Sequence, residues 1–300
     1  MSDNKRTEHS FGGTWTEIKL LRLEKYLKAY TKIFDVNEKA QYLNTTYVDA
    51  FAGTGYYSHK NKSVEGLLSL LPELEEAETQ SFLKGSAQIA LDIEPSFDRY
   101  LFIEQEQEYT NELHRLRNTH YENRHKIEIM QAEANSALNS WCTQQDWSKQ
   151  RAVVFLDPYA LEIKWPTLEV LGSTKVDLWL LWPIGQVINR LLTRNELPPE
   201  SWANALTNAF GTESWKTQFY APSEQHSLSF DENEAELGVV KTATFSEIEK
   251  FFVERLRTIF THVAPNPLYL YNSRNVPLYL LCFASHNEKG LKIATDILRK

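Results

Sequence analysis

The chain has 300 residues, of which 42% are hydrophobic and 12% aromatic, so it can bury a large core. That length allows one large α/β domain or two smaller ones. The net charge is −8, and acidic and basic residues are mixed along the chain. This balance argues against a protein that coats nucleic acid through a basic surface, although a small basic cleft on an acidic body is compatible with it.

Two distant cysteines, Cys142 and Cys282, exclude a disulfide scaffold, and no cysteine–histidine cluster has the spacing of zinc ligands. Three histidines lie between residues 114 and 125, but they alternate with arginines in a polar stretch, so we predict no metal site. No segment approaches the roughly 20 apolar residues of a membrane span. Residues 1–13 are polar and contain no apolar signal core. We expect a soluble, cytoplasmic protein with no membrane association.

The predicted elements begin with a disordered tail at residues 1–13 and a helix from about residue 14 to 32, whose apolar residues recur at helical spacing. Short β-rich runs then alternate with helical patterns. Strands are predicted at residues 47–51, 100–103, 126–130, 152–156 and 176–182, and helices at 87–93, 106–118, 135–141 and 166–171. This alternation indicates βαβ units and a parallel sheet. The strands are continuous apolar runs, which indicates that helices cover both faces.

Residues 186–262 are predicted to be mostly helical. A β-rich run at 278–284 and a helix at 288–298 are expected to return the chain to the sheet. We therefore divide the chain into four parts. These are a tail and packing helix (1–45), a Rossmann-like binding core (46–185), a mainly helical insertion or lid (186–275), and a final strand and helix that return to the core (276–300).

The ends of the predicted strands carry a series of polar residues and glycines. In chain order these are Asp49 with the loop AFAGTG, Glu104, Glu133 and the tripeptide Asp157-Pro158-Tyr159. In an open parallel sheet, ligands bind just beyond the carboxyl ends of the strands. Gly53 and Gly55 let the backbone approach a ligand closely, and an acid after the second strand is typical of sites that hold ribose hydroxyls. The order of these residues predicts a nucleoside-type cofactor.

Each member of this series also has a simpler interpretation. The glycine loop could be an ordinary tight turn. Glu104 could be a solvated acid in an acidic stretch, and Glu133 could lie in the first turn of a helix, where it favours the helix dipole. The glycine spacing differs from the G-x-G-x-x-G pattern, so a nicotinamide-dependent oxidoreductase is the less favoured alternative.

The loop AFAGTG after the first strand and the acid after the second resemble the S-adenosylmethionine (SAM)-dependent methyltransferases. The resemblance implies their Rossmann-like fold with a largely parallel sheet, here with a helical C-terminal insertion, and SAM as the cofactor. It also implies that the loop holds the methionine part, that Glu104 binds the ribose, and that Glu133 lies near the adenine amine. The cofactor-binding residues implied are Asp49, Phe51, Gly53, Gly55, Glu104 and Glu133.

Several longer blocks resemble one group within this class, the three-Cys-motif partner (TcmP) family. They are WTEIKLLRLEKYLKAY, YVDAFAGTGYY, GSAQIAL, FLDPYALEIKWPTLEVL and LWPIGQVINRLL. The match extends from Trp15 to the final block FASHNEKGLKIATDIL. The family is methyltransferase-like, and its partner is a protein with a three-cysteine, radical-SAM-like motif. The resemblance implies such a partner for this chain and supplies no substrate.

The tripeptide Asp157-Pro158-Tyr159 resembles the Asp-Pro-Pro-Tyr motif of methyltransferases that act on the exocyclic amino groups of bases. In that motif a carboxylate and a carbonyl accept hydrogens of the amine, and an aromatic ring stacks on the base. This chain has one proline fewer, so Tyr159 could take the place of the ring or of the second proline. We predict that Asp157 orients the acceptor. The alternative is that Asp157 caps a helix or orders the loop.

The function predicted from these motifs is that of a SAM-dependent methyltransferase that N-methylates a nucleic-acid base or nucleotide. Its catalytic residues are Asp157, Pro158 and Tyr159. The alternative is a methyltransferase-like, non-catalytic partner subunit of the three-cysteine protein.

Further contacts are possible. Trp15 and Lys19 could face the cofactor, and a pocket could be lined by Trp165, Trp182, Pro183 and Arg190, although helix packing and core tryptophans are the simpler interpretations. His286 could act as a base, although a single histidine in a loop usually has no catalytic role.

Overall fold

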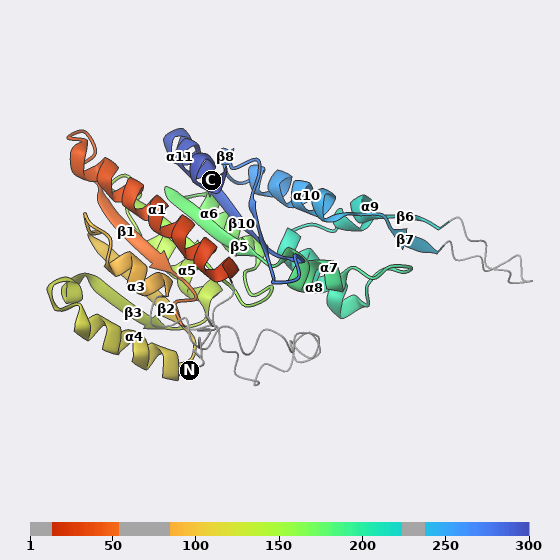
Figure 1. The fold of residues 1–300 in the computed structure, drawn as a ribbon, viewed down its shortest axis with the longest axis horizontal. Coiled ribbons are helices and arrows are strands. Elements are labelled where there is room, and N and C mark those ends of the chain that lie inside the picture. The colour runs from red at the N-terminus through yellow and green to blue at the C-terminus, as the bar shows by residue number, and fades with distance from the viewer. Residues whose placement is uncertain (1–13, 54–84, 224–237, 300) are drawn as a thin grey trace, which may run out of the picture.

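The structure is a computed structural model that describes residues 14–53, 85–223 and 238–299. An eight-stranded sheet lies at its centre, with helices on both faces (Figure 1). The N-terminal tail, predicted to be disordered, and Gly55, predicted to bind a cofactor, lie outside the described residues.

The central sheet is largely parallel. Its parallel strands are β1 (Asn44–Asp49), β2 (Arg99–Glu104), β3 (Ile127–Gln131), β4 (Gln150–Leu156) and β5 (Val176–Trp182). They lie in the order β3-β2-β1-β4-β5, and the antiparallel β10 (Pro277–Ser285) follows β5. The strand order reverses between β1 and β4, which is where Rossmann-like sheets bind ligands. This arrangement confirms the predicted Rossmann-like fold.

Helices bury the two faces of the sheet in separate apolar cores. One face is covered by four helices, α1 (Thr14–Val36), α3 (Ser86–Leu91), α4 (Gln107–Thr119) and α11 (Glu288–Arg299). The other face is covered by α5 (Ala134–Gln144) and α6 (Trp165–Gly172). A 3₁₀ turn, η2 (Tyr121–Lys126), links α4 to β3. Within β1, Tyr47 points into the first core and Val48 into the second. Both side chains are fully buried, which explains the continuous apolar strands.

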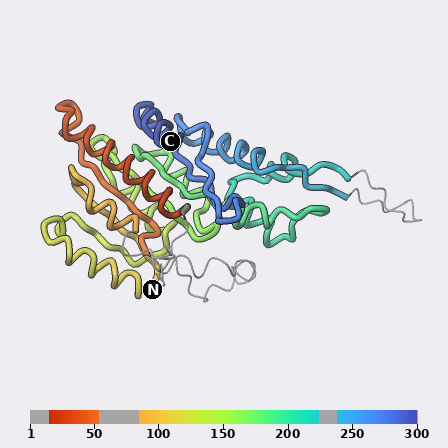
Figure 2. Tube along the Cα trace, in the orientation of Figure 1, coloured from red at the N-terminus to blue at the C-terminus, as the bar shows by residue number. Residues whose placement is uncertain are grey.

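The chain leaves the sheet after β5 and folds into a mainly helical segment. Its elements are η3 (Ile184–Ile188, a π-helix), α7 (Asn189–Leu191), α8 (Glu200–Phe210), α9 (Trp215–Phe219), β6 (Tyr220–Pro222), β7 (Val239–Lys241) and α10 (Phe245–Arg257). Figure 2 shows this segment extending to one side of the sheet, with β6 and β7 farthest from α1.

The chain returns to the sheet earlier than the sequence analysis expected. The strands β8 (His262–Val263) and β9 (Leu268–Tyr271) both pair with β10, although they lie within the range assigned to the insertion. They have two and four residues, and Pro265 and Pro267 separate them, so neither forms a recognisable apolar run. The boundary predicted at residue 275 is therefore too late.

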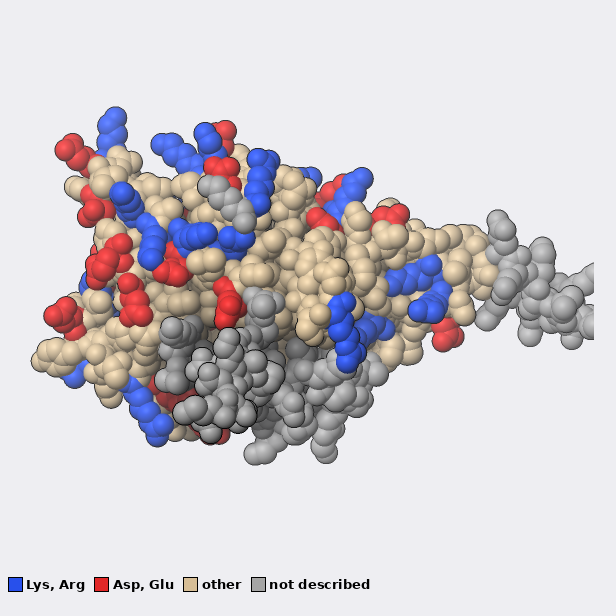
Figure 3. All heavy atoms as spheres, in the orientation of Figure 1, with Lys and Arg blue, Asp and Glu red and all other residues tan. Residues whose placement is uncertain are grey.

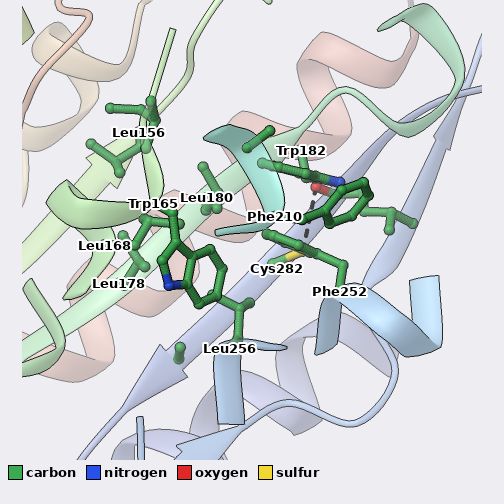
Figure 4. Close-up of a cluster of buried hydrophobic side chains, with 14 of the residues drawn as sticks. Leu156, Trp165, Leu168, Leu178, Leu180, Trp182, Phe210, Phe252, Leu256 and Cys282 are labelled. Atoms are coloured by element: carbon green, nitrogen blue, oxygen red, sulfur yellow. Dashed lines mark hydrogen bonds between the residues drawn. The ribbon is translucent and has the colours of Figure 1, made fainter. Parts of the chain in front are cut away.

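The tryptophans proposed as pocket residues belong to the core instead. Trp165 and Trp182 are each 2% exposed. The Trp182 ring stacks on Phe252 of α10 with ring centroids 3.8 Å apart and an interplanar angle of 8° (Figure 4). Pro183 is also buried, whereas Arg190 is exposed. This packing joins the helical segment to the sheet.

The visible surface carries both signs of charge. Figure 3 shows Lys and Arg interspersed with Asp and Glu over the face on which α1 lies. On this face, no large area carries a single sign of charge.

Candidate functional site

Three carboxylates meet at one edge of the sheet because their strands are parallel neighbours. Asp49 is the last residue of β1, Glu104 is the last residue of β2, and Asp157 directly follows β4. β1 lies between the other two strands, and Asp49 pairs with Phe102 on one side and Phe155 on the other. The structure thus brings together the residues that the sequence placed at successive strand ends.

Asp49 is fully buried at the centre of this edge. Its Oδ2 accepts hydrogen bonds from the Ser86 hydroxyl at 2.5 Å and the Tyr47 hydroxyl at 3.3 Å, and its Oδ1 accepts one from the backbone amide of Phe51 at 3.2 Å. Burial raises the pKa of Asp49 to about 7, and the nearby charge of Asp157 acts in the same direction. The Phe51 side chain is partly buried against the core, and its expected contact with a cofactor stays a prediction.

Replacing Asp49 by asparagine is expected to change how stability depends on pH. The pKa of Asp49 rises from 3.8 to about 7 on folding, so the unfolded chain ionises first and wild type loses stability between about pH 4 and pH 7. The D49N variant does not ionise at this position. Its stability relative to wild type is therefore expected to increase across that window by a few kcal/mol and then level off. Urea unfolding across this range measures the difference, and a difference independent of pH would contradict the prediction.

Glu104 and Gly53 form a close contact between β2 and the loop after β1. Glu104 Oε2 accepts a hydrogen bond from the Gly53 amide at 2.9 Å, and Oε1 accepts one from the Glu106 amide at 2.8 Å. A Cβ atom at Gly53 would lie 2.0 Å from Oε2, so only glycine fits there. Burial raises the pKa of the half-buried Glu104 carboxyl, while these amides oppose the change.

Glu133 caps the N-terminus of α5. Its carboxylate accepts hydrogen bonds from the backbone amides of Asn135 and Ser136 at 3.0 and 2.9 Å, and from both of their side chains. Burial tends to raise the pKa of Glu133, but these hydrogen bonds together lower it. This role as the N-cap of α5 is close to the simpler interpretation from the sequence, in which Glu133 lies in the first turn of a helix. Its expected contact with an adenine amine stays a prediction.

Glu162 is a site residue that the sequence analysis missed. Its Oε2 accepts a hydrogen bond from the Tyr159 amide at 3.1 Å, so it closes the loop that contains the tripeptide. Burial raises the pKa of Glu162 to about 7, and the charges of Glu104 and Glu133 add to the effect. The only signal in the sequence was that Glu162 is an acidic residue five positions after Asp157. Nothing in the neighbouring residues indicated that its side chain would lie near the acids at the other strand ends.

Asn135 holds the loops after β3 and β4 together. This buried amide donates to the Glu133 carboxylate at 2.5 Å and to the Glu162 carbonyl at 2.8 Å. Its oxygen accepts hydrogen bonds from the Lys164 amide at 3.0 Å and the Thr167 hydroxyl at 2.8 Å. The nitrogen and the oxygen of the side-chain amide each make two hydrogen bonds, so the geometry of both loops depends on Asn135.

Asp157 forms an ion pair with Lys19, which lies in α1 and is 138 residues away in sequence. The Lys19 side chain is 7% exposed and that of Asp157 is 24% exposed. The alternative that Asp157 caps a helix is wrong, since α6 begins at Trp165 with Lys164 as its N-cap. Pro158 is buried, and Tyr159 is half-buried against the core.

His286 lies at the opposite edge of the sheet. It follows β10, which is antiparallel to β5, and its neighbour Ser285 pairs with Asp177 near the start of β5. The His286 ring contacts the Gly172 carbonyl oxygen at 2.5 Å and the Thr261 hydroxyl at 2.8 Å. The idea that His286 serves as a base for this site is therefore wrong, because its strand runs in the other direction.

No metal cluster and no spanning helix occur in the described part of the chain. Within residues 14–53, 85–223 and 238–299, no three His, Cys, Asp or Glu side chains are placed to hold a metal ion. Over the same ranges, no helix is long and apolar enough to cross a membrane.

No family model matches the chain, and no curated protein matches it. Solved structures resemble it weakly. Protein LPL1258 from Legionella pneumophila is 19% identical with a TM-score of 0.40, and the match covers 84% of this chain and 94% of that one. Spermidine synthase from Thermotoga maritima is 7% identical with a TM-score of 0.39, covering 94% and 62%. The yhhF protein of Escherichia coli, described as a candidate methyltransferase, is 12% identical with a TM-score of 0.29, covering 89% and 87%.

Similarities at this level assign no function. The assignment of a methyltransferase-like Rossmann fold follows from the order and direction of the strands in the chain itself. The candidate site follows from the carboxylates that this order places together.

Proposed function

We propose that this chain is a SAM-dependent methyltransferase, with the cofactor at the ends of β1 and β2 and the methyl acceptor beside Asp157. The observation that carries the proposal is the convergence of Asp49, Glu104 and Asp157 at the switch point of the sheet. The acceptor proposed is a nitrogen atom of a nucleic-acid base or nucleotide, as the tripeptide Asp157-Pro158-Tyr159 suggests.

The residues at the ends of β1 and β2 suit a nucleoside with ribose hydroxyls. Glu104 accepts hydrogen bonds from the backbone amides of Gly53 and Glu106. A carboxylate has about four acceptor positions, so Glu104 can also accept a hydrogen bond from a ribose hydroxyl. Gly53 has no side chain to obstruct a ligand that approaches the loop. Asp49 is buried beneath them and orders the turn through the Phe51 amide.

SAM, when bound, supplies a methyl group on a sulfonium, which is already a good electrophile. The chain's own residues therefore need chiefly to bind and align the acceptor. Asp157 is placed to accept a hydrogen bond from an acceptor amine, and the Glu162 carboxylate holds the Tyr159 amide and thus the shape of the loop. A base within a duplex would have to be flipped out before it reached Asp157.

Isothermal titration with SAM and S-adenosylhomocysteine tests the cofactor site. Wild type is expected to bind in the micromolar range. The E104Q variant should bind at least about tenfold more weakly, because it loses the negative charge that strengthens hydrogen bonds from the ribose. Glu108 is exposed on α4, and E108Q serves as the matched control with unchanged affinity. Wild type that binds neither ligand would refute the proposal.

A second proposal is that the chain is a methyltransferase-like partner subunit of a protein with a three-cysteine, radical-SAM-like motif, as the resemblance to the TcmP family implies. Two observations favour it: the tripeptide lacks one proline of the Asp-Pro-Pro-Tyr motif, and Asp157 is engaged by Lys19. Methyl transfer by the isolated chain would refute it. Transfer that appears only when the three-cysteine protein is added would support it.

A further inference from the structure

The ion pair between Lys19 and Asp157 leaves the two carboxylate oxygens of Asp157 in different situations. The Lys19 ammonium contacts Oδ2. Among the described residues no donor contacts Oδ1, and about a quarter of the side chain is exposed. A carboxylate has about four acceptor positions, so Asp157 can accept a further hydrogen bond from a ligand while its negative charge is balanced by a neighbour.

Aromatic packing holds Lys19 in this position. Its ammonium lies 5.2 Å from the centre of the Trp15 ring, one turn earlier in α1. Trp15 in turn stacks on Tyr279 of β10, with ring centroids 5.0 Å apart. Lys19 is 6% exposed, so its side chain is a fixed part of the site rather than a mobile surface group.

A positive charge beside Asp157 acts differently on neutral and on protonated amines. A neutral amine donates a hydrogen to Oδ1 and keeps a nitrogen lone pair, which alkylation requires. A protonated aliphatic amine has no lone pair and would bring a second positive charge beside the Lys19 ammonium. Like charges placed close together in a partly buried site repel each other, and this repulsion lowers the affinity for the cationic amine.

We propose that Lys19 is a specificity-determining residue that makes the acceptor site at Asp157 select neutral amines, such as the amino groups of nucleobases, and exclude cationic amines such as polyamines and lysine side chains. The proposal rests on the acceptor site of the proposed methyltransferase. It adds to that site a residue of α1, which lies outside both the strand ends and the tripeptide Asp157-Pro158-Tyr159.

Binding of spermidine, a cationic amine, tests this role without any methyl transfer. We would titrate spermidine at low ionic strength into wild type, K19M, K19R and the double variant K19M/D157N. K19M is expected to bind spermidine at least about tenfold more tightly than wild type, because Asp157 becomes an uncompensated carboxylate. K19R should behave like wild type, and K19M/D157N should lose the gain. K28M is the matched control, since Lys28 is exposed in the same helix.

Equal spermidine affinity of K19M and wild type would overturn the proposal, as would a gain that persists in K19M/D157N. Should the K19M variant fail to fold, K19Q, which keeps a polar group at this position, replaces it in the same comparison. K19Q is expected to bind spermidine more tightly than wild type and to lose the gain in K19Q/D157N, and equal affinity of K19Q and wild type would overturn the proposal. These titrations contain no SAM, so their result is separate from the SAM titration that tests the proposed function.

Discussion

Replacing Asp157 by alanine is expected to lower the rate of methyl transfer about a thousandfold, with little change in affinity for SAM. The carboxylate is proposed to hold the acceptor amine in line with the methyl group, and such orientation and preorganised polar contacts account for effects of this size. Glu104 and Gly53, the proposed cofactor-binding residues, lie at other strand ends, and the hydrogen bond between them does not involve Asp157. Transfer of labelled methyl groups to pooled RNA and DNA measures the rate, and titration measures the affinity.

The design has to separate catalysis from stability, because Asp157→Ala leaves the buried Lys19 ammonium without its partner. Removing one partner of such a pair costs roughly 3–5 kcal/mol. The double variant K19M/D157A removes both charges and is expected to recover stability but not transfer. Asp296 is exposed on α11, and D296A is the matched control with full activity. Transfer by K19M/D157A at the wild-type rate would show that Asp157 is not catalytic.

Replacing Asn135 by alanine is expected to lower the free energy of unfolding by about 3–5 kcal/mol. The substitution removes the hydrogen-bond partner of the Thr167 hydroxyl, which is buried, and of the Lys164 amide and the Glu162 carbonyl, whose hydrogen bonds are partly buried. Each unsatisfied group of this kind costs about 1–3 kcal/mol. Urea denaturation monitored by circular dichroism measures the change.

Asn204 provides the comparison for this variant, because it is exposed on α8. N204A is expected to change the free energy of unfolding by no more than about 0.5 kcal/mol. The N135A variant should also bind SAM less well, since Glu133 and the loop of Glu162 lose their common anchor. A destabilisation by N135A as small as that of N204A would mean that the four hydrogen bonds do not order the loops.

The sequence predicted the central strands within a few residues, and it placed Asp49, Glu104 and Asp157 at one edge. That success has a simple physical basis. Buried parallel strands must be apolar on both faces, so they appear as continuous apolar runs, and the carboxyl ends of parallel strands necessarily share an edge. The antiparallel β10 shows where this reasoning stops, because its direction places His286 at the far edge.

The residues around the strand ends were harder to predict because their roles depend on distant partners. Glu162 and Asn135 join loops that follow different strands, and neither belongs to a periodic pattern. The short strands β8 and β9 exist only through pairing with β10. Trp165 and Trp182 could be placed in a core or in a pocket by sequence alone, and their burial decided between these positions.

By itself, the sequence determined a parallel sheet of βαβ units and the acids at its strand ends, since local periodicity and the geometry of parallel strands suffice for both. The tertiary structure alone decided the charge environment of Asp157. Lys19 occupies a helix position that would suit an ordinary packing residue, and only the fold carries its ammonium across 138 residues to the carboxylate. Electrostatic interactions act through space over a few ångströms, whereas sequence patterns report only neighbours along the chain.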